Sequence, residues 1–196
     1  MQSVDPDIRF MQMAMDQAEI AEENGDVPIG AVIVYENRVI AKAYNQREQL
    51  SDPTAHAEII SLTQAAAYIG NWRLHGCSIY VTLEPCTMCA GALVLGRLDR
   101  LVYGCDDPKT GAVKSLYNIV QDQRLNHTLE VTSGIMAREC SEQIQRFFLD
   151  ENGGFLMTST YRPRLRPLQG VHLQFGSVRD EAVRRIRQYL HGGEAA

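Results

Sequence analysis

The chain has 196 residues and is 45% hydrophobic, which is enough for one well-buried core and leaves little room for a second full-sized domain. Its formal net charge of -5 argues against a protein that coats nucleic acid without specificity. No apolar run approaches the ~20 residues that span a bilayer, and the N-terminus lacks a signal-peptide pattern, so we expect a soluble, cytoplasmic protein.

Helix and strand patterns alternate from the N-terminus onward. Apolar residues at helical spacing lie at residues 7–23, 55–69, 86–95 and 136–149. Segments rich in Val, Ile and aromatic residues, which are typical of strands, lie at residues 29–45, 78–83, 98–104 and 129–134. The first of these segments has a turn signature at Glu36-Asn37 and predicts a hairpin. A hairpin followed by strands interleaved with helices predicts an α/β fold with a mixed sheet.

The charge of the chain changes sign near its C-terminus. Residues 1–152 hold 12 Lys and Arg against 21 Asp and Glu, whereas residues 153–196 hold seven arginines against three acidic residues. The sequence DENGGF marks this change, and the segment SVRDEAVRRIRQYLHGG predicts a short basic amphipathic helix. We therefore predict a folded domain at 1–152 and a basic C-terminal extension at 153–196.

Two of the five cysteines, Cys86 and Cys89, are spaced for joint use. Because they lie three residues apart at the start of a helix, their sulfurs share one face, and the helix dipole stabilises the thiolate that binds metal. His56 is the natural third ligand, since it begins a neighbouring helix after another β-region. Three protein ligands leave one open position on a tetrahedral zinc ion, which is typical of catalytic sites. A redox pair is the alternative interpretation of the CxxC motif.

Glu58 follows His56 by two residues, and this spacing suits an acid/base rather than a fourth ligand. Two residues of helix turn a side chain by about 200° from its neighbour. From the first turn, the Glu58 carboxylate can still lean toward the open position of the ion. There it would take a proton from a zinc-bound water, whose pKa falls to ~7, and deliver it to the substrate.

These motifs carry a resemblance to a known family. The sequences His56-Ala57-Glu58 and Pro85-Cys86-Thr87-Met88-Cys89 resemble the H-x-E and P-C-x-x-C signature of the zinc-dependent cytidine/deoxycytidylate deaminase superfamily. Within it, the order and spacing of GDVPIGAVIV, DPTAHAEI, YVTLEPCTMCAGAL, YGCDDPKTGA and LNHTLEVTSGI resemble the bacterial tRNA-specific adenosine deaminases over about residues 5–149. The resemblance implies a three-layer α/β/α cytidine-deaminase-like domain with a central mixed sheet of about five strands, followed by the C-terminal extension.

The resemblance also implies an activity. Members of this family convert the wobble adenosine at position 34 of tRNA to inosine by hydrolytic deamination, with a zinc-activated water attacking C6 and a glutamate, here Glu58, moving the protons. It implies one zinc ion per chain held by His56, Cys86 and Cys89, an anticodon stem-loop as the RNA partner, and a homodimer. The main alternative is a deaminase of a free nucleobase or nucleoside such as guanine or cytosine, and a noncatalytic zinc-stabilised binding module is a third interpretation.

Four further positions are candidates for binding the substrate. By the resemblance, Asn45 hydrogen-bonds the nucleoside, while Asp107 and Lys109 lie along the ribose and phosphate of the nucleotide. The small side chain of Ala57 could leave room for a flipped base. The ordinary alternatives are a turn residue at the end of a strand for Asn45, a turn at Asp107 and a solvated Lys109.

The C-terminal end departs from the family pattern. Members commonly end the last helix with basic residues that approach the RNA, whereas here Phe147-Phe148 is followed by the acidic, glycine-rich LDENGG. We hypothesise that arginines of the extension restore these phosphate contacts, with a solvated extension as the alternative. The arginines in question are Arg162, Arg164, Arg166, Arg184, Arg185 and Arg187.

Overall fold

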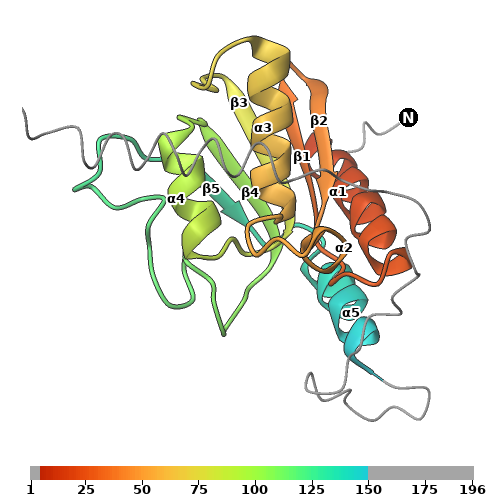
Figure 1. The fold of residues 1–196 in the computed structure, drawn as a ribbon. Helices are drawn as coiled ribbons and strands as arrows, with labels where there is room; N and C mark the ends of the chain where they lie inside the picture. The colour runs from red at the N-terminus through yellow and green to blue at the C-terminus, as the bar shows by residue number, and fades with distance from the viewer. Residues whose placement is uncertain (1–4, 150–196) are drawn as a thin grey trace, which may run out of the picture. The chain divides into compact units, whose positions relative to one another are not determined.

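A five-stranded mixed sheet forms the centre of residues 5–149, the part of the chain that the computed structural model describes (Figure 1). Its strands are β1 (Gly30–Tyr35), β2 (Arg38–Tyr44), β3 (Cys77–Leu83), β4 (Arg100–Cys105) and β5 (Glu130–Ser133). Their order across the sheet is β2-β1-β3-β4-β5. β1 pairs antiparallel with β2 and β3, whereas β4 runs parallel to both β3 and β5. The predicted mixed sheet is therefore confirmed.

The β1–β2 hairpin turns at Glu36-Asn37, as the sequence predicts. Both residues have positive φ angles, 48° and 61°, which is what the type I′ turns of two-residue hairpins require. Asn tolerates this region well, whereas Glu adopts it only where the surrounding structure imposes it. β1 lies between β2 and β3, and it is buried from Gly30 to Val34 because helices cover both of its faces.

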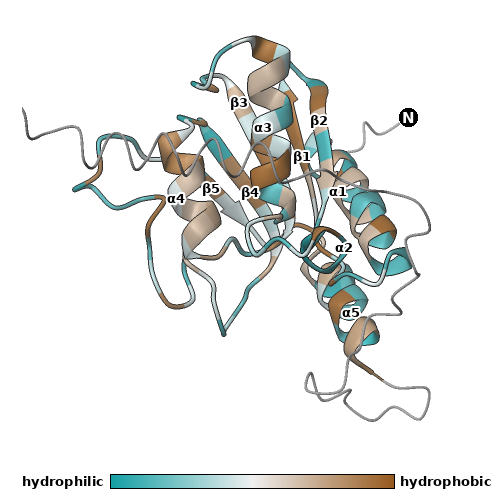
Figure 2. Ribbon diagram, viewed as in Figure 1, coloured by the Kyte–Doolittle hydropathy of each residue, from teal (hydrophilic) through white to brown (hydrophobic). Residues whose placement is uncertain are grey.

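Helices cover both faces of the sheet, so the predicted three-layer architecture is confirmed (Figure 1). The helices α1 (Pro6–Glu23) and α5 (Ala137–Phe148) pack on one face, and α3 (Ala57–Ile69) and α4 (Thr87–Leu95) on the other. Successive strand residues point to opposite layers, with Val32 facing α1 and Ile33 facing α3. In Figure 2, hydrophilic and hydrophobic residues alternate along α1 and α5, as expected for helices with one solvent-exposed face.

Most helix boundaries agree with the sequence patterns to within two residues. α3 begins at Ala57 after its N-cap residue His56, and α4 begins at Thr87 after its N-cap residue Cys86. The sequence patterns did not predict α2 (Arg47–Leu50), a single helical turn. Its amides at Glu48 and Gln49 donate to the carboxylate of Asp26, which lies more than 20 residues earlier in the chain. This turn therefore depends on a long-range contact that local patterns do not contain.

The predicted basic extension at 153–196 and its helix lie outside the described residues. Between residues 5 and 149, none of the helices combines the length and the apolar character that crossing a membrane requires.

Candidate active site

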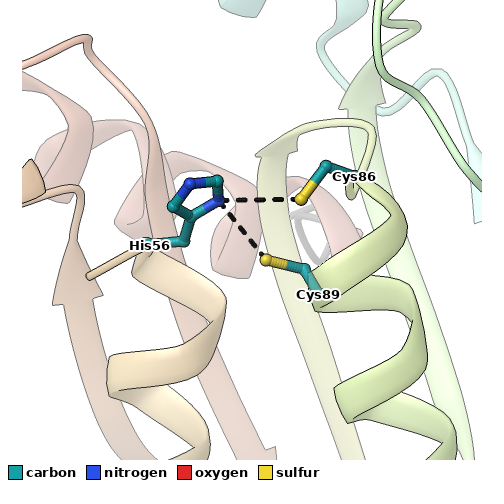
Figure 3. A group of neighbouring side chains, drawn as sticks. All are labelled: His56, Cys86 and Cys89. Carbon is teal, nitrogen blue, oxygen red and sulfur yellow. Dashed lines mark hydrogen bonds between the residues drawn. The ribbon is translucent and has the colours of Figure 1, made fainter. Parts of the chain in front are cut away.

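The two sequence motifs meet at the N-terminal ends of neighbouring helices. His56 precedes α3, Cys86 follows β3 and precedes α4, and Cys89 lies in the first turn of α4. The backbone of both cap residues is extended, and neither side chain caps its own helix. The imidazole and the two sulfurs are therefore free to face one another across the gap between α3 and α4, as Figure 3 shows.

The geometry of this cluster fits a tetrahedral zinc ion. His56 Nδ1 lies 3.7 Å from Cys86 Sγ and 3.5 Å from Cys89 Sγ, and the three donor atoms lie within 4.8 Å of one another (Figure 3). Zinc bonds of 2.0–2.1 Å to nitrogen and 2.3 Å to sulfur, at a tetrahedral angle, separate the two atoms by about 3.6 Å. The three side chains could thus hold zinc with little rearrangement. Among residues 5–149, no other group of His, Cys, Asp and Glu forms such a cluster.

The pKa values of the two thiols are shifted in opposite directions. Hydrogen bonding from Cys89, aided by the neighbouring His56, lowers the pKa of Cys86 to about 4. The same contact with Cys86, together with burial, raises the pKa of Cys89. The hydrogen bond to Cys86 also raises the pKa of His56. The cluster therefore favours a thiolate at Cys86, which is the form that binds metal.

Glu58 lies in the first turn of α3 and lines the same pocket as His56 and Cys86. The residue is only 4% exposed, and this burial raises the pKa of its carboxyl group. Glu58 is not one of the three clustered donors. A carboxyl group that protonates readily beside a metal-binding cluster is chemically suited to accept and return a proton.

The pocket beside the cluster has a volume of about 150 Å³. Three of the four predicted substrate-binding residues line it, namely Asn45, Ala57 and Asp107. Lys109 does not line the pocket, and its side chain is exposed. The structure therefore brings together every predicted site residue except Lys109.

Asn45 is held in place by a buried carboxylate. The residue is 3% exposed, and its Nδ2 donates to Asp26 Oδ1 and to the carbonyl of Val27, both at 3.3 Å. Its backbone amide donates to the carbonyl of Ile29 at 2.9 Å. With Nδ2 engaged in this way, the side-chain oxygen is the group of Asn45 that remains to accept a hydrogen bond from a ligand.

The sequence patterns did not single out three polar residues around this pocket. Asp26 is fully buried and orients Asn45 and α2, while the exposed Arg47 lines the pocket wall. Glu84 is 2% exposed, and although burial opposes its ionisation, hydrogen bonds from Ser115, Asp107 and Lys114 lower its pKa to about 2. A surface arginine carries no sequence signal, and the partners of both carboxylates are mainly backbone amides in distant segments.

The fold and the donor cluster define a deaminase. The family model of the MafB19-like deaminases matches residues 6–150. The tRNA-specific adenosine deaminase of Haemophilus influenzae is 50% identical to this chain over 143 residues, covering 72% of this chain and 83% of that protein. The tRNA-specific adenosine deaminase of Bacillus subtilis is 47% identical over 139 residues, covering 71% of this chain and 86% of that protein.

A solved structure, from a study of A-to-I editing by tRNA:A34 deaminases at the wobble position of transfer RNA, is also similar. It is 45% identical to this chain with a TM-score of 0.67, and the match covers 69% of this chain and 98% of that one. The chain thus belongs to the tRNA-specific adenosine deaminase family, and it also matches the MafB19-like deaminase family model. The family expected from the motifs is confirmed.

Proposed function

We propose that the protein converts the wobble adenosine, position 34 of tRNA, to inosine by hydrolytic deamination. The observation that carries this proposal is the placement of buried Glu58 beside the His56, Cys86 and Cys89 donors in one pocket, in a chain whose relatives are tRNA-specific adenosine deaminases. The overall reaction replaces the amino group at C6 of adenine by oxygen from water and releases ammonia.

His56, Cys86 and Cys89 would hold one zinc ion per chain. When bound, the ion would act as a Lewis acid and lower the pKa of the attacking water to about 7. The three side chains contribute one nitrogen and two sulfurs from the starts of α3 and α4, which pack in the same core cluster on one face of the sheet. This donor set is typical of the superfamily.

Glu58 would move the protons of the reaction. Its carboxylate takes up the proton that the attacking water loses, and delivers it to N1, the ring nitrogen next to C6. A second transfer moves the remaining proton of the oxygen now bonded to C6 to the amino nitrogen, and ammonia leaves as the C6–N bond breaks. Burial supports this role, because a carboxyl group with a raised pKa can hold the proton between the two transfers.

The pocket would receive a single unstacked base. A cavity of about 150 Å³ can hold a small aromatic ring, and Ala57, which is fully buried, contributes only a methyl group to its wall. Asn45 would hydrogen-bond the nucleoside and Asp107 the ribose, whose 2'-hydroxyl can donate to a carboxylate. The exposed Lys109 and Arg47 would contact backbone phosphates.

Release of ammonia from an anticodon stem-loop, compared with release from free bases and nucleosides, tests the proposed function. We expect turnover of the stem-loop that contains adenosine at the wobble position, and none of a matched stem-loop with guanosine there. Turnover of free guanine or cytosine alone would replace the proposal with the alternative of a free-base deaminase. No turnover of any substrate by the zinc-loaded protein would favour a binding module.

We also propose that the protein acts as a homodimer in the cytoplasm, as its family implies. Large apolar side chains on α4 and on the loop before β5 support an interface, since Leu95, Leu116 and Tyr117 are each more than half exposed. Light scattering on the full chain checks the assembly. A monomeric mass at micromolar concentration would contradict the dimer.

The basic extension at 153–196 is proposed to bind RNA phosphates. The support is its charge, seven arginines against three acids, next to a body in which acids outnumber basic residues. Truncation after Asn152 should lower the affinity for tRNA and make it less dependent on salt, because fewer counterions are released on binding. Unchanged affinity and an unchanged salt slope would show that the extension makes no phosphate contacts.

A further inference from the structure

Glu84 lies at the end of β3, directly before the Pro85-Cys86 turn that carries the first sulfur of the cluster. Its carboxylate accepts five hydrogen bonds from one distant segment, residues 107–115. Oε1 accepts from the backbone amides of Val113, Lys114 and Ser115, at 3.1, 2.7 and 2.9 Å. Oε2 accepts from the backbone amide of Asp107 at 2.9 Å and from the hydroxyl of Ser115.

The segment is wrapped closely around this carboxylate. A Cβ atom on Gly111 would overlap Glu84 Oε2, so only glycine allows the backbone to pass this close. The segment also contacts the turn that precedes α4, because Ala112 donates to the carbonyl of Pro85 at 2.9 Å and Gly111 forms a β-bridge with Cys86. One buried side chain therefore lies between the sulfur-bearing turn and residues 107–115.

The same segment forms one wall of the pocket. Asp107 and Thr110 line it, and the Asp107 carboxylate accepts hydrogen bonds from the amide of Lys109 and the hydroxyl of Thr110. The amide of Asp107 donates directly to Glu84. The position of Asp107 in the wall is thus fixed by two sets of contacts. Its backbone amide bonds to Glu84, and its carboxylate accepts hydrogen bonds within its own turn.

The chemistry of the contact requires a carboxylate. Four backbone amides and one hydroxyl point at two oxygens, and every one of these groups is acting as a donor. Buried backbone N–H groups need a hydrogen-bond acceptor. Residues 107–115 lie outside the helices and strands, so they have no regular backbone hydrogen bonding that could replace the Glu84 carboxylate. A carboxylate accepts at both oxygens, whereas a carboxamide accepts at only one.

We infer that Glu84 is a positioning residue for the substrate, which holds residues 107–115 against the Cys86 turn and thereby places Asp107 and Thr110 for contact with the bound nucleotide. The role in nucleotide binding rests on the proposed function. The placement of the segment itself does not, so the two can be tested separately.

Glu84→Gln is the decisive variant, because it keeps the size of the side chain and converts one acceptor oxygen into a donor. In either orientation of the amide, an NH2 group faces at least one backbone N–H. We expect faster hydrogen exchange of the amides of Asp107 and residues 113–115 in the full-length, zinc-loaded protein. For the anticodon stem-loop we expect KM to rise about tenfold or more, as for loss of a charge-assisted hydrogen bond, with kcat changing by less than about threefold.

Two further variants separate positioning from general stability. Ser115→Ala removes only the hydroxyl contact and should give a smaller rise in KM with the same sign. Asp7→Asn is the matched control, because the Asp7 carboxylate accepts hydrogen bonds from Tyr80 and Arg100 in the layer formed by α1 and α5, on the opposite face of the sheet. It should lower stability without changing KM or the exchange of residues 107–115.

Unchanged exchange and unchanged KM in Glu84→Gln would overturn the inference, as would loss of zinc from that variant with no change in the exchange of residues 113–115. Where Glu84→Gln fails to fold, Ser115→Ala decides: wild-type exchange and KM in that variant would also overturn it. If the wild-type protein does not deaminate the stem-loop, the proposed function fails, and the exchange experiment still tests whether Glu84 holds the segment.

Discussion

Replacing Glu58 with glutamine keeps the shape of the buried side chain and removes its ability to carry a proton. The size of the effect follows from the other acids in the pocket. Glu84 already accepts five hydrogen bonds and has a pKa of about 2, so it is a poor proton carrier. Both oxygens of Asp107 are engaged by the turn at Lys109 and Thr110. No pocket-lining acid among the described residues is therefore placed to substitute for Glu58.

A general acid–base group contributes about 10²–10⁴-fold, and in the proposed reaction one carboxylate serves both proton transfers. We expect Glu58→Gln to lower kcat by at least about 10³-fold, or about 4 kcal/mol in activation free energy. The assay is single-turnover formation of inosine in the anticodon stem-loop, with zinc content and melting temperature measured on the same sample. Zinc content should stay near one per chain, since Glu58 is not among the clustered donors.

The matched control is Glu142→Gln, which makes the same chemical change on α5, where the Glu142 side chain is 65% exposed. It should leave kcat unchanged. A Glu58→Gln variant that binds zinc and keeps more than about a tenth of the wild-type rate would refute the proton-transfer role. A loss of less than about tenfold is smaller than the usual contribution of a general acid–base group.

Two other predictions concern the metal and the fold. Removal of zinc by a chelator should abolish deamination, and added zinc should restore it. Cys86→Ser should weaken zinc retention, because it replaces a sulfur ligand by a hydroxyl group. Activity that survives complete chelation would contradict the metal centre. Asp7→Asn should lower the free energy of unfolding at pH 7 by about 1–2 kcal/mol. Because hydrogen bonding from Arg100 lowers the pKa of Asp7 in the folded state, this loss should shrink as the pH falls below about 4, and a pH-independent difference between variant and wild type would contradict it.

The alternation of strands and helices could be predicted from the sequence because its signals are local. Hydrophobic periodicity and the Glu36-Asn37 turn lie within single elements, and the observed boundaries follow them closely. α2 was missed because its amides depend on Asp26. His127 Nε2 likewise lies 2.6 Å from the carbonyl oxygen of Leu98, a contact between distant segments that no local pattern predicts.

The donor cluster was predictable because its members occupy the starts of helices. β2 and β3 both run antiparallel to β1, so the helices that follow them, α3 and α4, begin at the same end of the sheet. The residues that position the pocket could not be predicted from the sequence. Asp26 and Glu84 act mainly on backbone amides, which every non-proline residue possesses, so no residue pattern identifies their partners. The place of Lys109 outside the pocket also depends on the turn at Asp107, which spacing alone does not determine.

The proposed substrate is the wobble adenosine of tRNA. Sequencing tRNA after incubation with the zinc-loaded full-length protein tests this proposal, because inosine is read as guanosine at the modified position. We predict conversion at position 34 of a tRNA that carries adenosine there, and none at the other adenosines of the same molecule. Absence of inosine at position 34, in a preparation that deaminates a free base or nucleoside, would contradict the claim.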